Sequence, residues 1–413
     1  DCDWDSDCRP FDCDWDSEDI DENQVTIRIQ ISEYFRSVEI PRFVSERQSG
    51  RRTILGLTTA GNFSQLGARL LLSPLVPAIM LTFEVSKSVI GMALTGLWAT
   101  YAVFQYPGGT LADRFDERRI LLLSLGLTTV ATLTIARAPD FVVFGLAVVF
   151  LGAGAGLYFP VASSMLTKRF DRTGQALSVM TAGGSLAGLM YPAAAGYLET
   201  VIGWRLTMVL GAGVSGVVFI VGTILTTSPA NSSDDRSRSG LSLGAIASIL
   251  GDPAVLYTIA IAASLSFVWQ GLSSFFPTFL VEYRAVSTTV AGVAFGVLFL
   301  LSTIAQPVVG RISDLFAREQ ALIVSGVLAA SGLFVVLSTS SLLWLLIGVV
   351  ILGSGVSWPG VMQAKIMDHF TDENRGSGFG LVRAVYMGLG SIGSVVVGTV
   401  ADTYGWPLAI GLV

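Results

Sequence analysis

The sequence predicts an all-α polytopic membrane protein built from two pseudo-symmetric six-helix bundles. Of its 413 residues, 52% are hydrophobic and 14% are charged, and the mean hydropathy is +0.66, whereas soluble domains carry about 25% charged residues. The apolar residues form long segments, and about 20 apolar residues span a bilayer as a helix. Motifs of the first half also recur about 200 residues later. This composition excludes a soluble enzyme or nucleic-acid binder of this size.

Residues 1–50 form an acidic tail that differs from the rest of the chain. They hold 14 of the 31 Asp and Glu residues and all three cysteines, Cys2, Cys8 and Cys13. Acids and thiols could bind a metal, but a disordered cytoplasmic tail is the simpler interpretation, and no metal or other cofactor is predicted. The tail has no apolar segment typical of a signal peptide. Because the first Met is Met80, we interpret the tail as a fragment or an artefact of a predicted reading frame.

Eleven long apolar segments follow the tail, and a twelfth begins near Trp406 and is cut off at Val413. The polar stretch 228–250 is the longest connection between them, so it predicts a cytoplasmic linker between an N-terminal bundle, 51–227, and a C-terminal bundle, 251–413. The predicted spans are 53–80, 88–112, 119–137, 140–166, 174–198, 204–227, 252–281, 288–313, 319–338, 341–366 and 376–402.

The distribution of Lys and Arg predicts the orientation in the membrane. With the N-terminus inside, 15 basic residues lie at or near the inner ends of the spans and 4 lie at the outer side. Cytoplasmic loops carry such an excess of basic residues. We therefore expect a multi-pass protein of the plasma membrane with a cytoplasmic N-terminus.

Several short motifs recur in the same order at a nearly constant offset. Gly109-x-x-x-Asp113 matches Gly310-x-x-x-Asp314, and Gly196 with Trp204 matches Gly398 with Trp406. Gly154-x-Gly156-x-x-x-Pro160 matches the same pattern at 353–359. Together the matches indicate duplication of a six-helix unit, and parallel repeats of this kind occur in one class of secondary transporters.

The stretch between the second and third spans, Gly109-Thr-Leu-Ala-Asp-Arg-Phe-Asp-Glu-Arg-Arg119, resembles the loop signature Gly-x-Leu-Ala-Asp-Arg-x-Gly-Arg-Arg of the major facilitator superfamily. The resemblance covers about residues 51–413 and implies that fold and transport by alternating access. Asp116 and Glu117 depart from the signature. Tyr191-Pro192-Ala-Ala-Ala-Gly196 departs from the Gly-Pro-x-x-Gly-Gly of the superfamily's drug antiporters, which argues against proton-driven drug export.

The resemblance also implies an inner gate. It places Asp113 against the start of the eleventh span, near 375–378, and Asp314 against the start of the fifth, near 172–174, where a carboxylate would cap a positive helix end. The alternative is that these charges only set the topology. The predicted gating residues are Gly109, Asp113, Arg114, Arg118, Gly310, Asp314, Arg318, Arg172 and Arg375.

Arg69 lies in the middle of the first span, where a charge is costly and usually functional. Asn62 and Gln65 share its helix face by spacing, and a guanidinium suits carboxylate or phosphate. We predict that Arg69 anchors an anion, although a structural pairing is the alternative. Arg383 could be a second ligand, part of the gate or a snorkelling residue. The predicted substrate-binding residues are Arg69, Asn62, Gln65, Tyr101, Gln105, Tyr158, Trp269, Gln270, Gln306, Arg383 and Tyr386.

The middle third of every predicted span lacks Asp and Glu, and the single histidine, His369, falls in a loop. Anion exchange, facilitated diffusion or a proton carried by the substrate therefore fits better than a protein proton relay. The predicted function is a monomeric secondary carrier for a small organic or inorganic anion, with the lipid bilayer and the solute as its partners and no nucleic acid. The alternatives are an efflux carrier for hydrophobic compounds and a non-transporting membrane sensor on a carrier fold. The sequence shows no nucleophile grouped with a base, so we do not predict an enzyme.

Overall fold

The computed structural model describes residues 47–413 except 115, 171, 226–242, 340 and 371–374. Residues 1–46 of the predicted tail and 228–242 of the predicted linker lie outside the described residues, and the last four residues of the predicted tail belong to the first helix. Within the described ranges the regular structure is entirely helical. The helices are α2 (Arg47–Leu70), α3 (Leu72–Phe83), α4 (Lys87–Arg114), α5 (Glu117–Arg137), α6 (Phe141–Thr167), α7 (Thr173–Leu225), α8 (Leu243–Gly251), α9 (Pro253–Glu282), α10 (Thr288–Leu315), α11 (Arg318–Ser338), α12 (Leu342–Gly355), α13 (Pro359–Met367), α14 (Arg375–Gly390), α15 (Ile392–Tyr404) and α16 (Trp406–Gly411).

Ten helical segments in the described part of the chain are long and apolar enough to cross a membrane. The longest, α7, has 53 residues and changes direction at Gly203, where φ is 79° and ψ is 159°. Glycine adopts this backbone conformation without a Cβ penalty. Counting the two parts of α7 separately gives the eleven complete spans that the sequence predicts. Gly405, with φ 84° and ψ 170°, makes the equivalent turn before α16.

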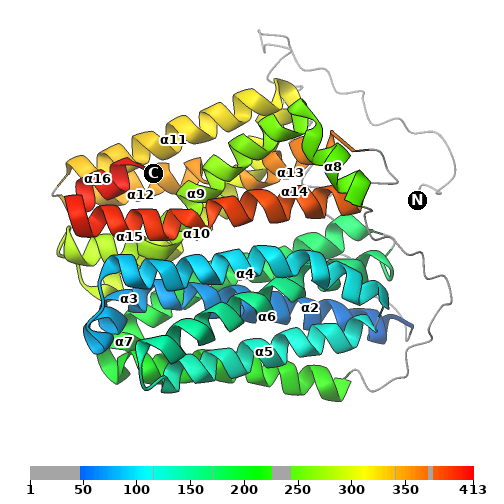
Figure 1. Ribbon diagram of the computed structural model, residues 1–413, viewed down its shortest axis with the longest axis horizontal. Coiled ribbons are helices and arrows are strands. Elements are labelled where there is room, and N and C mark those ends of the chain that lie inside the picture. The colour runs from blue at the N-terminus through cyan, green and yellow to red at the C-terminus, as the bar shows by residue number, and fades with distance from the viewer. Residues whose placement is uncertain (1–46, 115, 171, 226–242, 340, 371–374) are drawn as a thin grey trace, which may run out of the picture. The chain divides into compact units, whose positions relative to one another are not determined.

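The spans form two bundles, α2–α7 and α9–α16, which lie one below the other in Figure 1. One difference from the predicted layout concerns the linker 228–250. Its last residues, from Leu243 on, form the helix α8. Ile249 and Leu250 of this helix pack against the apolar core of the second bundle, so burial of its apolar side stabilises it. Asp252 then caps α9 by accepting a hydrogen bond from the Ala254 amide at 2.8 Å, as an N-cap carboxylate does.

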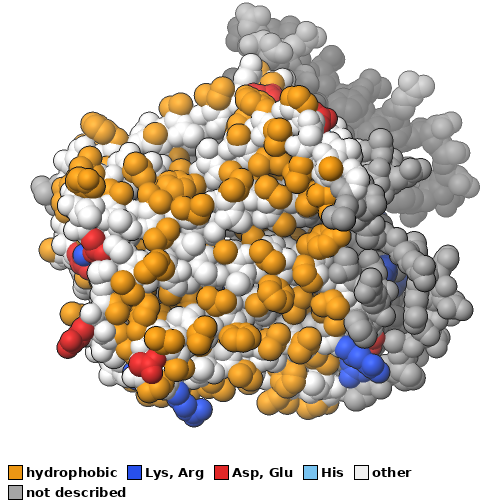
Figure 2. All heavy atoms as spheres, in the orientation of Figure 1, with side chains coloured by type: hydrophobic (Ala, Val, Ile, Leu, Met, Phe, Trp, Pro, Cys, Tyr) orange, Lys and Arg blue, Asp and Glu red, His pale blue; other side chains and the backbone are white. Residues whose placement is uncertain are grey.

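We name the two ends of the helices after charged residues. At the Lys87 end α4 begins and α9 ends, and at the Arg318 end α5 and α11 begin. Figure 2 shows apolar side chains spread along the helices, with the visible charged side chains toward their ends. This distribution matches a bilayer-spanning surface, where lipid contacts apolar side chains and water contacts charged ones.

The apolar core differs between the two ends. One cluster contains residues of both bundles, such as Leu75 and Ile79 of α3 with Phe275 and Phe279 of α9. Two further clusters lie toward the Arg318 end, and each contains residues of one bundle alone. The bundles therefore share a core at the Lys87 end and have separate cores at the Arg318 end.

Candidate functional site

Arg69 is buried near the end of α2, with 9% of its surface exposed. Its Nε donates to the backbone oxygen of Gln65 at 3.2 Å. Its guanidinium carbon lies 4.1 Å from the centroid of the Tyr101 ring and 5.4 Å from that of Trp98. Stacking on aromatic faces stabilises a guanidinium while its edge stays able to donate hydrogen bonds.

Arg383 approaches the same place from the other bundle, on α14. Its guanidinium carbon lies 4.8 Å from the ring centroid of Phe159 on α6 and 5.8 Å from that of Phe379. Its Nε is buried and has no hydrogen-bond partner in the described part of the chain. The Tyr101 side chain interacts with both Arg69 and Arg383. One tyrosine thus lies within electrostatic range of two arginines from opposite bundles.

The two guanidinium groups lack a described counter-charge. Neither Arg69 nor Arg383 forms an ion pair with any Asp or Glu that the structure describes. Charges at membrane depth are costly and normally pair or serve a ligand. An oxyanion between the two arginines would supply the negative charge and the acceptors that this arrangement lacks.

Three further predicted site residues lie on α4 or α14, or bond to α14. Tyr386 is buried on α14 within electrostatic range of Arg383 and Tyr101. Gln105 donates from its Nε2 to the sulfur of Met387 at 3.4 Å. Gln270 donates from its Nε2 to the Met387 backbone oxygen at 3.1 Å, while its Oε1 is buried without a partner among the described residues. Helices α4, α9 and α14 bring these polar groups together.

Asn62 and Gln65 share the helix face of Arg69 but bond to helices of their own bundle. The Asn62 side chain donates to the Met180 backbone oxygen on α7 at 2.9 Å. Gln65 donates to the Ser124 hydroxyl at 3.0 Å and accepts from the Thr128 hydroxyl at 2.7 Å, both on α5. These bonds fix α2 against α5 and α7. A role of these two residues in binding substrate stays a prediction.

The remaining predicted ligands form no hydrogen bond or ring contact with Arg69, Tyr101 or Arg383, and their role in binding stays a prediction. The Tyr158 hydroxyl donates to the Thr58 backbone oxygen at 2.6 Å, which uses it in packing α6 on α2. Trp269 packs edge-to-face on Phe299, with ring centroids 4.9 Å apart. Gln306 is half-buried on α10, and the structure shows no hydrogen bond of its side chain to the described residues.

The predicted gate contact between Asp314 and the start of α7 is not made in this structure. Asp314 and Arg172 are both exposed, and no ion pair joins them. A Cβ added at Gly310 would meet no atom within 4 Å. The other predicted contact lies outside the described side chains, as do Gly109, Asp113, Arg114 and Arg375.

Two predicted gating residues instead bond within their own bundles. Arg318 pairs with Asp368, with 3.0 Å between Nη2 and Oδ1. Arg118 donates to the Thr223 backbone oxygen at 3.2 Å. These contacts tie neighbouring helix ends at the Arg318 end, and their role in gating stays a prediction.

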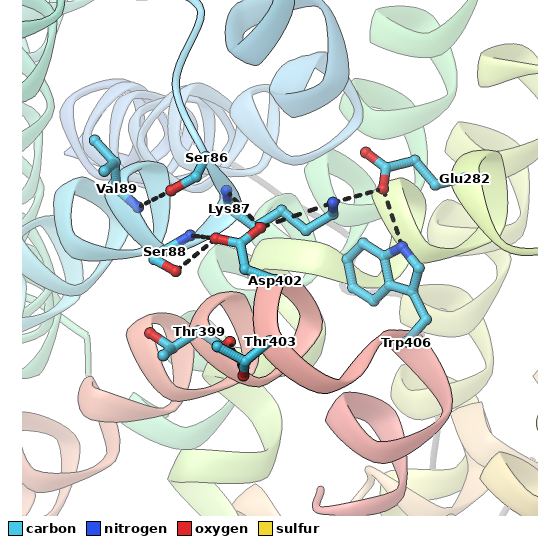
Figure 3. Close-up of polar contacts among 9 residues, drawn as sticks. All are labelled: Ser86, Lys87, Ser88, Val89, Glu282, Thr399, Asp402, Thr403 and Trp406. Carbon is cyan, nitrogen blue, oxygen red and sulfur yellow. Dashed lines mark hydrogen bonds and ion pairs between the residues drawn. The ribbon is translucent and has the colours of Figure 1, made fainter.

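A polar cluster that the sequence did not predict joins the bundles at the Lys87 end (Figure 3). Lys87 Nζ of the first bundle lies 3.0 Å from Glu282 Oε2 and 3.8 Å from Asp402 Oδ1 of the second. Asp402 also accepts from the Ser88 amide at 2.7 Å and the Ser88 hydroxyl at 2.5 Å. Trp406 Nε1 donates to Glu282 Oε2 at 3.0 Å. We call these five residues the Lys87 cluster.

Beside the Lys87 cluster, α4 and α15 lie in backbone contact. A Cβ added at Gly398 would lie 2.4 Å from the Lys87 backbone oxygen, and one at Gly91 would lie 2.8 Å from the Ser394 backbone oxygen. Distances under 3.0 Å are impossible for a real Cβ without movement of the backbone. The glycines therefore allow the two bundles to close tightly against each other.

Helices α7 and α10 make the equivalent contact on the other side. A Cβ added at Gly196 would lie 2.4 Å from the Thr288 backbone oxygen, and one at Gly292 would lie 2.3 Å from the Pro192 backbone oxygen. These four positions correspond to Gly398, Lys87, Gly91 and Ser394 at a shift of 201 or 202 residues. The duplicated glycines thus close the Lys87 end along two symmetric seams.

The structure is a two-bundle membrane fold with duplicated halves and two equivalent seams. Comparison with known proteins identifies the family to which this fold belongs. A family model of the Major Facilitator Superfamily matches residues 58–353 and 280–413. The chain belongs to the major facilitator superfamily. The resemblance seen in the loop at 109–119 is thereby confirmed, and so is the predicted fold class.

Curated relatives within the superfamily differ in substrate. The MFS-type transporter YcnB of Bacillus subtilis is 26% identical over 39% of this chain, and the match spans 35% of YcnB, about a third of its length. The probable nitrate transporter NarT of Staphylococcus epidermidis is 23% identical over 76% of this chain and 79% of its own. The hexuronate transporter of Bacillus subtilis is 22% identical over 85% of this chain and 88% of its own.

Solved structures of the superfamily share the fold. The bacterial homologue of the human lysosomal transporter Spinster, inward-facing and unoccupied, superposes with a TM-score of 0.76 at 19% identity, over 86% of this chain and 84% of that one. The nucleoside transporter NupG superposes with a TM-score of 0.75 at 13% identity, over 88% and 95%. The two-bundle arrangement is therefore that of major facilitator transporters.

Proposed function

We propose that this major facilitator protein is a secondary carrier that moves a small organic or inorganic anion by alternating access. The observation that carries the proposal is the pair Arg69 and Arg383, which come from opposite bundles and form no ion pair with the described acids. Arg69 stacks on Tyr101 at 4.1 Å, and Arg383 lies within electrostatic range of the same tyrosine. Since alternating access moves one bundle against the other, an anion held by both arginines would be bound at the moving interface. The site lies within one chain, which supports a monomer as the working unit.

We further propose a plasma-membrane location with the Arg318 end in the cytoplasm. The excess of Lys and Arg at that end supports this orientation. The shared core and the Lys87 cluster would then close the outer end, and the separate cores would belong to the open, inner end. The gate at Asp113 and Asp314 would form when the carrier closes inside. Substrates named for two relatives, nitrate and hexuronate, are both anions and agree with the proposed substrate class.

Binding and flux measurements test the proposal. Purified protein would be titrated with sodium nitrate and sodium glucuronate, with thermal stabilisation as the readout, and each anion that binds would be tested for flux in proteoliposomes. Arg69→Ala should weaken binding about 10- to 100-fold, because a charge-assisted hydrogen bond contributes roughly 1.5–3 kcal/mol and about 1.4 kcal/mol is tenfold. Arg69→Lys should recover part of the affinity, because lysine keeps the charge without the planar fork.

Arg137→Ala is the matched control, because Arg137 is exposed at the end of α5. Wild-type affinity in a well-folded Arg69→Ala protein would refute the anion site. Flux of hydrophobic compounds in its place would favour the efflux carrier, and binding without any flux would favour the membrane sensor.

A further inference from the structure

The hydroxyl of Thr95 on α4 is inserted between two backbone groups of a helix in the opposite bundle, where it interrupts the helical hydrogen bonding. It donates to the Ser391 backbone oxygen at 3.0 Å and accepts from the Val395 amide at 3.1 Å. In a regular α-helix this amide and this oxygen would bond to each other, since residue i accepts from residue i+4. One side chain thus replaces one hydrogen bond of the eleventh span, at the boundary between α14 and α15.

Insertion of a side chain into the ladder is a known cause of a helix kink. At membrane depth both freed backbone groups need a partner, because lipid offers none. A hydroxyl can donate and accept at once, so Thr95 serves both groups. The Ser391 oxygen also accepts from the Ser394 amide at 3.3 Å, whereas the Val395 amide bonds to Thr95. Such an interruption bends a helix, so the bend expected between α14 and α15 depends on a residue of the other bundle.

The symmetric seam lacks this insertion. The position equivalent to Thr95 is Gly296 on α10, and the position equivalent to Ser391 is Leu189 on α7. A Cβ added at Gly296 would lie 2.5 Å from the Leu189 backbone oxygen, so the helices touch there without a side chain between them. Because the duplicated halves differ at this point, the insertion is a feature of one seam and not of the general fold.

The insertion lies about two helical turns from Arg383 on one helix and from Tyr101 on the other. Arg383 and Tyr386 are on α14, eight and five residues before Ser391, and Tyr101 is on α4, six residues after Thr95. We propose that Thr95 is a positioning residue for the anion site: by holding the bend of the eleventh span, it sets the direction of α14 and thereby places Arg383 at Tyr101. The consequence for anion affinity depends on the proposed function, whereas the bend itself does not.

Three variants separate the hydroxyl from the volume of the side chain. Thr95→Val has nearly the same shape and loses both hydrogen bonds, and Thr95→Ser keeps the hydroxyl. Thr95→Ala combined with Val395→Pro removes the amide that needs an acceptor, leaves room for the proline ring where the Thr95 hydroxyl lies and favours a kink, so it should restore the bend. Thr129→Val is the matched control, because the half-buried Thr129 hydroxyl bonds only within its own helix, to the Leu125 oxygen.

The first readout needs no substrate. Spin labels at Gly380→Cys on α14 and Thr167→Cys on α6, in protein with its three tail cysteines replaced by serine, report the distance between the bundles at the Arg318 end. Thr167 is exposed, and a Cβ at Gly380 meets no atom within 4 Å. Thr95→Val should shift or broaden the distance distribution, while Thr95→Ser, Thr129→Val and the double variant should resemble the parent. An unchanged distribution in Thr95→Val would overturn the proposal, and so would poor folding of both Thr95→Val and the double variant.

The second readout is affinity for glucuronate and nitrate. Thr95→Val should bind about tenfold more weakly or worse, since displacements near 1 Å at a site can cost up to about 100-fold, while Thr95→Ser should stay within about twofold. Wild-type affinity in Thr95→Val would refute the positioning role. If the parent protein bound neither anion, the proposed function would fail, and the distance measurement alone would decide whether Thr95 holds the bend.

Discussion

The carboxylate of Asp402 on α15 caps the start of α4 at Ser88, 314 residues earlier in the chain. It accepts hydrogen bonds from the amides of Lys87 and Ser88 at 3.2 and 2.7 Å. The first amides of a helix lack partners and carry partial positive charge. A carboxylate of one bundle thus caps a helix of the other. Separating the bundles at this end would leave the carboxylate and the first amides of α4 without each other as partners.

We therefore predict that Asp402→Asn weakens closure of the Lys87 end. Asparagine keeps the shape but removes the charge that faces Lys87 and the helix start. Ser73 is 3% exposed and donates to the Ser274 oxygen across the bundles, so a Ser73→Cys thiol reports opening at this end. Its modification by a membrane-impermeant maleimide should become several-fold faster in Asp402→Asn.

Glu199→Gln is the control for this prediction. Glu199 is a half-buried acid at the same end of the helices, and it forms no ion pair with the described residues. An equal rise in both variants, or no rise in Asp402→Asn, would show that the cap does not hold this end closed.

We also predict that Gly398→Ala prevents tight closure of the seam between α4 and α15. The added Cβ would lie 2.4 Å from the Lys87 backbone oxygen, so the helices must move apart. Spin labels at the exposed residues Met92 and Tyr404 should report a longer distance, and flux should fall while the amount of protein in the membrane stays normal.

Gly213→Ala is the matched change, because a Cβ at Gly213 meets no atom within 4 Å. It should leave both the distance and the flux unaltered. A Gly398→Ala protein with the parent distance would mean that the seam accommodates a methyl group.

The sequence was sufficient to predict the spans and the duplication, because both depend on local composition and spacing. Eleven apolar segments and the repeated Gly–Trp pairs required no knowledge of packing. The structure adds the reason for the repeat: Gly196 and Gly398 are the points where the bundles touch.

The environment of each polar side chain could not be predicted in the same way. Asn62 and Gln65 do share the face of Arg69, as the spacing indicated, but a helix inside a bundle has neighbours on several sides. Their amides bond to α7 and α5. The Lys87 cluster was missed because Lys87, Glu282 and Asp402 lie far apart in sequence, and only packing of the two bundles brings them together.

The last prediction uses a second pair of equivalent residues, Glu117 and Glu319, at the Arg318 end. Glu117 is 7% exposed and accepts from Ser164 at 2.8 Å and Arg169 at 2.9 Å, with Lys168 Nζ at 2.8 Å. Glu319 pairs with Lys365 and is exposed. Both contacts join the start of one span to the end of the next span in the same bundle. The two bundles therefore repeat the same ion-pair contact, buried at Glu117 and exposed at Glu319.

Burial decides the expected effect of removing each charge. Hydrogen bonds to a charged group contribute roughly 1.5–3 kcal/mol, whereas an exposed ion pair contributes about 0–1 kcal/mol. Glu117→Gln should therefore lower the midpoint of thermal unfolding in detergent by several degrees, and Glu319→Gln should change it little. High salt should reduce the effect at Glu319 more than that at Glu117, because exposed charges are screened. Equal losses in the two variants would contradict this account, since they would mean that burial of the Glu117 carboxylate adds nothing to its three contacts.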